Sequence, residues 1–146
     1  MEVSERFAGC ASNVYQTLLD LFKQDYQEST GKKIVDSQIR NGLHYQKKFG
    51  KRNENSVRVT VGEMISNHQY SVAISSNRGV QWLTYLCEDT GINEVRITYL
   101  EEYLPEGKLN GWNYKFMLPF MKKNLEKRMR LQVRKLAEFA QNKEVQ

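Results

Sequence analysis

The sequence contains few of the residues that would point to a metal site or a disulfide framework. It has two cysteines and two histidines in 146 residues. Cys10 and Cys87 form no disulfide pattern, and no cysteine or histidine lies at metal-ligand spacing from another. We therefore expect no metal ion and no cofactor, and a reducing cytoplasm is the compartment that this cysteine content favours.

Long apolar runs are also missing. The longest, over 116–121, is interrupted by Pro119 and is far shorter than the roughly 20 residues that cross a bilayer. The acidic start of the chain shows no targeting segment, and with two prolines and nine glycines there is no low-complexity linker. The composition is typical of a soluble globular protein, and the length suits one domain, 1–146.

Signatures of catalysis are equally scarce. The segment 30–33 (TGKK) lacks the upstream glycine of a phosphate-binding loop. Cys87 shares a predicted strand face with Leu83 and Tyr85, which is typical of a small core residue rather than a nucleophile. The sequence therefore favours a protein that is not an enzyme, although it does not settle the question.

The apolar pattern predicts an order of elements. A short strand over 2–8 precedes a helix that Ser12 or Asn13 caps and Gly31 ends, and a helical turn follows near Asp36. From Leu43 the period changes to two residues, and strands are predicted over 43–49, 57–61, 70–75, 80–88 and 95–104. Because short polar turns join these five strands, we expect an antiparallel meander.

The segment 112–143 closes the chain as a predicted amphipathic helix. Its apolar stripe consists of Met117, Met121, Leu125, Met129, Val133, Leu136 and Ala140. Pro119 lies inside the segment, where it either kinks the helix or starts it. A curved six-stranded antiparallel sheet that grips this helix buries both apolar surfaces, so the predicted class is α+β.

This order resembles the helix-grip fold of the START and pollen-allergen-like superfamily, abbreviated SRPBCC. The runs LTYL at 83–86 and VRITYLEEY at 95–103 fall where that superfamily often has similar ones. The segments 30–39 and 42–49 are similar to a small group of uncharacterised bacterial proteins with a domain of unknown function. The resemblance implies a cavity between sheet and helix that holds a hydrophobic or amphipathic small molecule, and it carries over no catalytic residue.

Tyrosines recur on the predicted inner face of the sheet. Tyr45, Tyr85 and Tyr99, with Tyr70, either fill the core or form a cavity wall whose hydroxyl groups orient a ligand. Glu101 shares this face if the alternation continues from Tyr99. At a cavity rim it would bind a polar ligand group or act as a general base; the alternative is a solvated side chain.

Three further aromatic residues project from the side of the closing helix opposite its stripe. Trp112, Phe116 and Phe120 pack against an earlier helix, surround the mouth of the cavity where a ligand enters, or meet a membrane surface. We include them among the predicted ligand-binding residues. Trp82 and Leu86 should point outward from the sheet, which suggests a homodimer through that face; a monomer in light-scattering measurements at micromolar concentration would count against it.

The positive charge concentrates near the end of the chain. The segment 112–143 carries nine Lys or Arg and two Glu, whereas the whole chain has a net charge of +5. The plain interpretation is the solvated back of a helix. The alternative is docking on an anionic membrane or a protein partner, and it requires unpaired cations on an exposed face: Lys122, Lys123, Lys127, Arg130 and Arg134. Nucleic acid is a less favoured partner than these, because this face lacks interleaved aromatic residues.

The combined prediction is a small ligand-binding protein. Its first alternative is a cyclase- or hydrolase-like enzyme of the same superfamily that uses Glu101 or a tyrosine as acid or base. Its second alternative is surface binding through the basic helix. The identity of the ligand is beyond the sequence.

Overall fold

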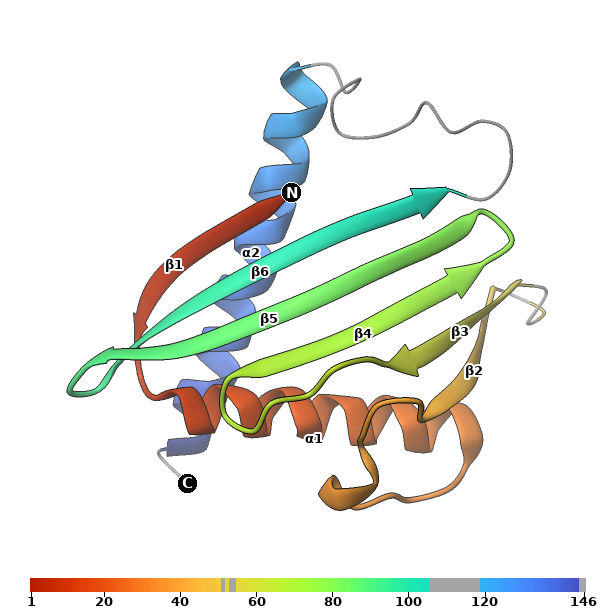
Figure 1. Cartoon of the computed structure of the whole chain (residues 1–146), viewed down its shortest axis with the longest axis horizontal. Helices are drawn as coiled ribbons and strands as arrows, with labels where there is room; N and C mark the ends of the chain where they lie inside the picture. Colours follow the sequence, from red (N-terminus) through yellow and green to blue (C-terminus); the bar gives the residue numbers. More distant parts are fainter. Residues whose placement is uncertain (51, 53–54, 106–118, 145–146) are drawn as a thin grey trace.

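Two helices lie on one face of a curved sheet in the computed structural model (Figure 1). The structure describes residues 1–50, 52, 55–105 and 119–144, and the side chains at 105, 119–121 and 143–144 lie outside this description. The helix α1 runs along one end of the sheet, and α2 meets α1 near the start of α1 and extends away across the sheet (Figure 1). Together the helices outline an L on the concave face.

The sheet is an antiparallel meander of the strands β2 to β6, with β1 added at the edge beside β6. Its order is β1-β6-β5-β4-β3-β2, so the first strand pairs with the last. The bounds are β1 Glu2–Ala8, β2 His44–Phe49, β3 Asn55–Val61, β4 Gln69–Ser76, β5 Gly79–Gly91 and β6 Glu94–Pro105. This arrangement confirms the predicted fold class.

The strand β5 is longer than the sequence predicted. Residues 89–91, beyond the predicted strand end at 88, are part of the strand, which pairs with β6 as far as Gly91↔Glu94 after a register shift between Asp89 and Gly91. The reversal falls instead at Ile92 and Asn93, and Asn93 adopts a left-handed backbone with φ 57°. Asparagine tolerates this conformation better than most residues, so it can make the tight turn.

The helix α1 (Ala11–Thr30) begins differently from the prediction. Neither Ser12 nor Asn13 caps it, because Cys10 occupies the N-cap position. The main-chain N–H of Ala11 instead donates a 2.7 Å hydrogen bond to Asp89 of β5. A carboxylate supplied by the sheet therefore satisfies the helix start. At the other end Gly31 forms the predicted cap with φ 76°, and the expected helical turn is η1 (Asp36–Gln38).

The helix α2 is described over Pro119–Glu144. Both alternatives for Pro119, a kink and a helix start, stay predictions, because the residues that precede it lie outside the described part of the chain. The remaining part of the predicted helix, 112–118, lies outside the described residues. None of the described helices is both long and apolar enough to cross a bilayer.

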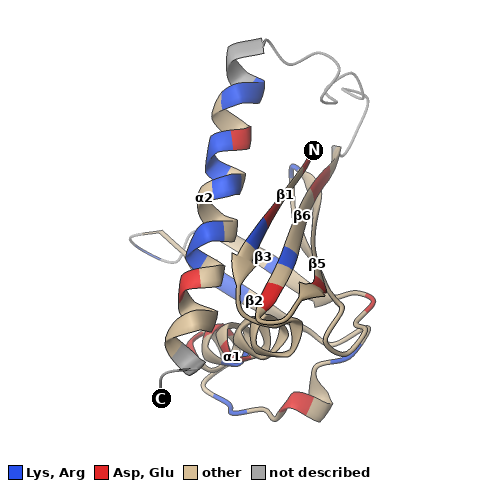
Figure 2. Ribbon diagram, turned by 90° about the vertical axis from the view of Figure 1, so that its left-hand side faces the viewer, with Lys and Arg blue, Asp and Glu red and all other residues tan. Residues whose placement is uncertain are grey.

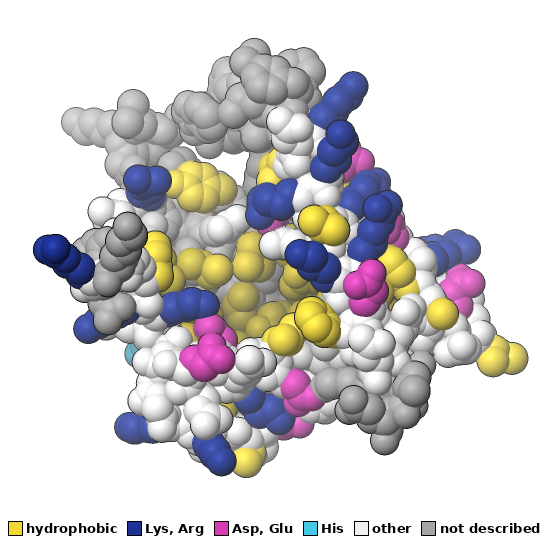
Figure 3. Space-filling model, turned by 180° about the vertical axis from the view of Figure 1, so that it is seen from behind, with side chains coloured by type: hydrophobic (Ala, Val, Ile, Leu, Met, Phe, Trp, Pro, Cys, Tyr) yellow, Lys and Arg dark blue, Asp and Glu magenta, His cyan; other side chains and the backbone are white. Residues whose placement is uncertain are grey.

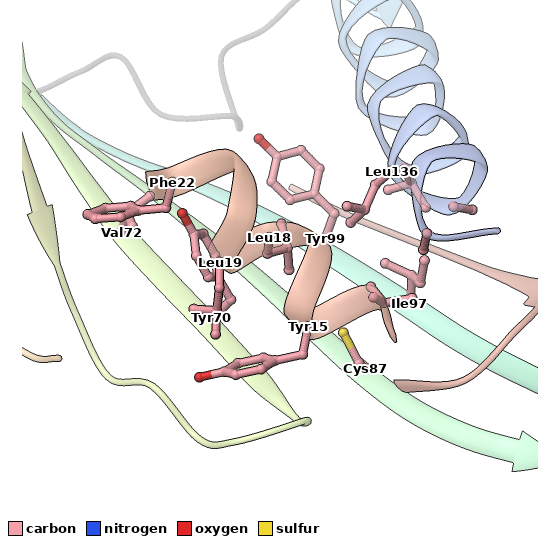
Figure 4. Packing of buried hydrophobic residues seen from close by; sticks show 14 of the residues in the cluster. Tyr15, Leu18, Leu19, Phe22, Tyr70, Val72, Cys87, Ile97, Tyr99 and Leu136 are labelled. Atoms are coloured by element: carbon pink, nitrogen blue, oxygen red, sulfur yellow. The ribbon is translucent and has the colours of Figure 1, made fainter. Parts of the chain in front are cut away.

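The core lies in the angle between the two helices and the sheet. On α2 the predicted stripe is buried at Met129, Val133, Leu136 and Ala140. Figure 4 shows Tyr99 of β6 between α1 and α2, near Leu136. Contacts of α2 are concentrated on β1 and α1, whereas α1 also touches β2, β4 and β5. Each helix thus covers one margin of the concave face.

Candidate functional site

The middle of the concave face is incompletely covered. Ile74, Gln81, Leu83 and Tyr85 point inward from the central strands β4 and β5, yet each is only partly buried. Towards β1 the same face is sealed, since Ile97 is 0% exposed. Figure 3 shows a hollow with hydrophobic side chains on its floor beside the Lys- and Arg-rich surface of α2. We call this feature the central hollow.

One part of the central hollow is a defined pocket of about 220 Å³. It lies between α1 and the strands β2, β3 and β4, and most of its lining is apolar. The lining residues are Leu21, Phe22, Asp25, Tyr45, Lys47, Val57, Val59, Tyr70, Val72 and Ile74. The apolar surface would bind hydrocarbon groups, and the few polar groups would fix their orientation.

The polar edge of this pocket is a hydrogen-bonded triplet. The Tyr45 hydroxyl donates to Asp25 Oδ2, and Lys47 Nζ lies 2.6 Å from Asp25 Oδ1. Burial, and to a smaller extent the interaction with Asp25, raises the pKa of Tyr45 far above its usual range. Tyr45 therefore remains a neutral hydrogen-bond donor at physiological pH.

Three other tyrosines form a row across the sheet. Tyr70, Tyr85 and Tyr99 are paired in register on β4, β5 and β6. The rings of Tyr85 and Tyr99 stack with centroids 4.4 Å apart. Burial, and to a smaller extent the negative charge of Glu101, raises the pKa of Tyr85 to about 12. Of the predicted wall residues, Tyr85 reaches the hollow, whereas Tyr99 is 1% exposed and belongs mainly to the core.

Glu101 lies deeper than the sequence suggested. The predicted alternation places it correctly on the inner face, opposite Leu83 of β5. It is not a rim residue, however, because it is only 1% exposed. Among the described residues, three side chains donate to the carboxylate: Tyr99 Oη at 2.6 Å from Oε2, and Arg128 Nη2 and Gln81 Nε2 at 2.8 and 3.3 Å from Oε1. Such donors offset the cost of burying the negative charge.

Arg128 and Gln81 are the members of this cluster that the sequence did not single out; Arg128 is the charged one. It stands on α2 among many basic residues, and nothing in the local pattern distinguishes it from its neighbours. The only available signal was its helical offset from Arg130, which places the two side chains on different flanks. Choosing between the flanks requires knowing where α2 meets the sheet.

The chain matches one protein family over most of its length. The model of a domain of unknown function, DUF3284, matches residues 1–122. The chain belongs to this family. No curated protein matches the sequence.

Solved structures show how widely this DUF3284 protein shares its fold. DynU16, from the dynemicin biosynthetic locus, superposes with a TM-score of 0.61 at 10% identity, over 97% of this chain and 46% of DynU16. The chain thus spans less than half of DynU16. Ara h 8.0201 gives 0.58 at 6% identity, over 97% of this chain and 98% of that one. Norcoclaurine synthase from Thalictrum flavum gives 0.52 at 15%, over 70% and 67%. These likenesses confirm the predicted helix-grip fold.

The basic residues of α2 are partly engaged within the DUF3284 domain. Figure 2 shows Lys and Arg over the upper and middle parts of the helix. Arg130 Nη1 lies 3.0 Å from Glu5 Oε1, and Arg134 Nη2 lies 3.3 Å from the same atom. The condition set for surface binding, unpaired cations, is therefore not met at these two arginines, because the inward side of β1 supplies a carboxylate beneath them. Lys123 and Lys127 are exposed.

The remaining predicted residues fall elsewhere. Trp112, Phe116 and the side chain of Phe120 lie outside the described residues. Trp82 and Leu86 are on the outer sheet face, as expected, opposite Ala73 and Gln69 of β4. Both are partly buried rather than fully exposed, so the homodimer stays a prediction.

Proposed function

We propose that this protein binds a hydrophobic or amphipathic small molecule in the central hollow. The observation that carries the proposal is the partial exposure of Ile74, Leu83 and Tyr85 on the two central strands. Inward-facing apolar side chains at the middle of a sheet are normally covered, because their burial stabilises the fold. A ligand that covers them removes this apolar surface from water.

The size of the defined pocket limits what it could hold. Its volume of about 220 Å³ is below the roughly 300–1,000 Å³ typical of sites that enclose a drug-sized ligand. We therefore expect the pocket to take one apolar segment of the ligand. The rest of the ligand would extend along the central hollow over Leu83.

Catalysis is less well supported than binding. Norcoclaurine synthase bears the name of an enzyme, but at this level of identity the likeness concerns the fold alone. A general base needs an accessible oxygen near the substrate. Glu101 is buried, and both of its oxygens already accept hydrogen bonds from this chain. A cyclase- or hydrolase-like role through Glu101 would require this cluster to rearrange.

Surface binding through α2 is also less well supported. Its predicted condition was a group of unpaired cations, yet Arg130 and Arg134 are held by Glu5. Intramolecular pairing reduces the attraction that these two arginines would exert on an anionic membrane.

A pair of tryptophan substitutions tests the binding proposal. Leu83→Trp places an indole ring on the floor of the hollow, whereas Leu100→Trp makes the same change on the outer face of the neighbouring strand. Nile red, an uncharged fluorescent probe of apolar sites, is titrated into each protein. We expect Leu83→Trp to weaken Nile red binding about tenfold or more, because the indole ring occupies the floor of the hollow and the probe loses buried apolar contact there. Leu100→Trp should bind like the native protein.

Two checks keep this experiment decisive. Circular dichroism and chemical denaturation establish that each variant is folded. Leu83→Ala, which enlarges the hollow, should retain binding. The proposal is wrong if the native protein does not bind Nile red, or if both tryptophan variants lose binding equally.

A further inference from the structure

Arg128 lies on the flank of α2 that is turned away from β1. Arg130 is two positions further along the helix, about 200° around its axis, and it pairs with Glu5 on β1. Arg128 instead reaches Glu101 on β6, whose carboxylate also accepts from Gln81 on β5. Because β1 is the edge strand, this flank is the one directed towards the middle of the sheet and the central hollow.

The two partners of this ion pair differ in exposure. The Glu101 side chain is 2% exposed, whereas the Arg128 side chain is 50% exposed. A guanidinium group has five N–H donors, and within the described part of the chain Arg128 donates through Nη2 to Glu101. The remaining donors are thus available at the surface of the hollow.

Glu101 itself is positioned rather than accessible. Tyr99 donates to one carboxylate oxygen, while Gln81 and Arg128 donate to the other. Both Tyr99 and Glu101 are 1% exposed, so a ligand in the hollow cannot reach them without displacing side chains. The buried carboxylate therefore orients the Arg128 guanidinium and leaves its outer donors free for an acceptor.

The surroundings add positive charge on the same side. The helix α2 carries eight Lys or Arg and three Glu, and Figure 3 shows basic side chains beside the hollow. A hollow with a low-dielectric floor and cations on one margin concentrates a positive potential. An anionic group is the kind of ligand terminus that this potential attracts.

We propose that the ligand is an amphipathic anion whose carboxylate binds Arg128 while its apolar chain lies on the floor of the central hollow. Glu101 is then a positioning residue and not a ligand contact. This inference rests on the proposed function. A carboxylate suits the site because guanidinium and carboxylate groups match in planar, paired geometry.

Three probes with the same hydrocarbon chain test the charge of the ligand. Decanoate, decanol and decylamine each compete with Nile red at neutral pH, in the native protein and in variants. We expect decanoate to compete best in the native protein. Arg128→Gln should weaken decanoate about tenfold or more, the usual effect of losing a hydrogen bond to a charged group, and should change decanol less than about twofold.

Matched variants separate recognition from stability. Arg130→Gln removes the same charge from the other flank of α2 and should leave the preference for decanoate intact. Because Arg128→Gln leaves the buried Glu101 without its cation, it could unfold the protein. The double variant Glu101→Gln, Arg128→Gln neutralises both groups, and it too should lose the preference for decanoate over decanol.

The outcomes are distinguishable. Equal competition by decanoate and decanol would overturn the inference and leave apolar binding in place. A preference for decylamine would also overturn it, and would indicate that Glu101 rather than Arg128 meets the ligand. If Nile red itself does not bind to the native protein, the proposed function fails and this inference fails with it.

Discussion

The contact between Glu5 and two arginines of α2 provides a direct test of what holds the closing helix on the sheet. Glu5→Gln removes the charge and keeps the shape of the side chain. Arg130 donates to Oε1 of Glu5 at 3.0 Å, and Arg134 donates to both oxygens at 3.3 Å. The variant weakens these hydrogen bonds together, so the free energy of unfolding should fall.

The expected size of this effect follows from exposure. The Glu5 side chain is 19% exposed, while Arg130 and Arg134 are 35% and 59% exposed. Fully exposed ion pairs contribute about 0–1 kcal/mol, and hydrogen bonds to buried charges about 1.5–3 kcal/mol. Because one partner is mostly buried and two are partly solvated, we expect Glu5→Gln to cost about 1–2 kcal/mol. Urea denaturation followed by circular dichroism measures it.

The effect should depend on pH with a defined sign. Burial alone raises the pKa of Glu5, but hydrogen bonds from Arg134 and Arg130 outweigh burial and leave the pKa lowered in the folded protein. A lowered pKa stabilises the folded state at a pH above the unfolded value of roughly 4.3, and the contribution disappears as pH falls through the folded pKa. The stability difference between native protein and variant should therefore be constant near neutral pH and shrink below about pH 4.

A control on the same strand makes this prediction specific. Glu2→Gln removes the same charge from β1, on the opposite and exposed face. It should change stability by less than about 0.5 kcal/mol. If Glu5→Gln and Glu2→Gln behave alike, or if the loss in Glu5→Gln persists unchanged below pH 4, the reasoning about this contact is incorrect.

Two further predictions concern other parts of the structure. A Cβ atom at Gly62 would lie 2.8 Å from Cζ3 of Trp82, so Gly62→Ala should lower the free energy of unfolding by about 1–3 kcal/mol, measured by denaturation. In a Trp82→Val background this loss should largely vanish. An unchanged loss would contradict the steric explanation. Burial, with a smaller effect of the Asp89 charge, raises the pKa of the Cys87 thiol to about 12. Iodoacetamide at pH 8 should therefore modify only the partly exposed Cys10 in the folded protein. Cys10→Ser should abolish this labelling, and modification of Cys87 in the native state would show that its environment is more open.

Much of the fold could be predicted because its signals are local. Alternation at Val57, Val59 and Val61 specifies a strand with one buried face whatever its neighbours are. The helix end at Gly31 could also be read from the chain, because a left-handed cap favours glycine. The start of α1 could not, since the cap is Asp89, distant in the sequence and brought there by the sheet.

The sequence likewise predicted some features of the candidate site and not others. Alternation placed Tyr85 and Glu101 on the inner face, because successive strand residues point to opposite sides. It could not show that Tyr85 reaches the hollow while Glu101 is buried, because depth depends on where the helices cross the sheet. The donors to Glu101 within the described ranges come from β5, β6 and α2, and no local pattern relates them.

The sequence by itself determined the elements, their order and the face on which each side chain lies, because these properties follow from backbone periodicity and short-range sterics. Only the tertiary structure decided that α1 and α2 meet as an L and leave Ile74, Leu83 and Tyr85 in the middle of the concave face only partly buried. It also decided that Arg130 faces Glu5 while Arg128 faces Glu101. Such pairings depend on the angle and position of helix packing, which long-range burial sets and no window of sequence contains.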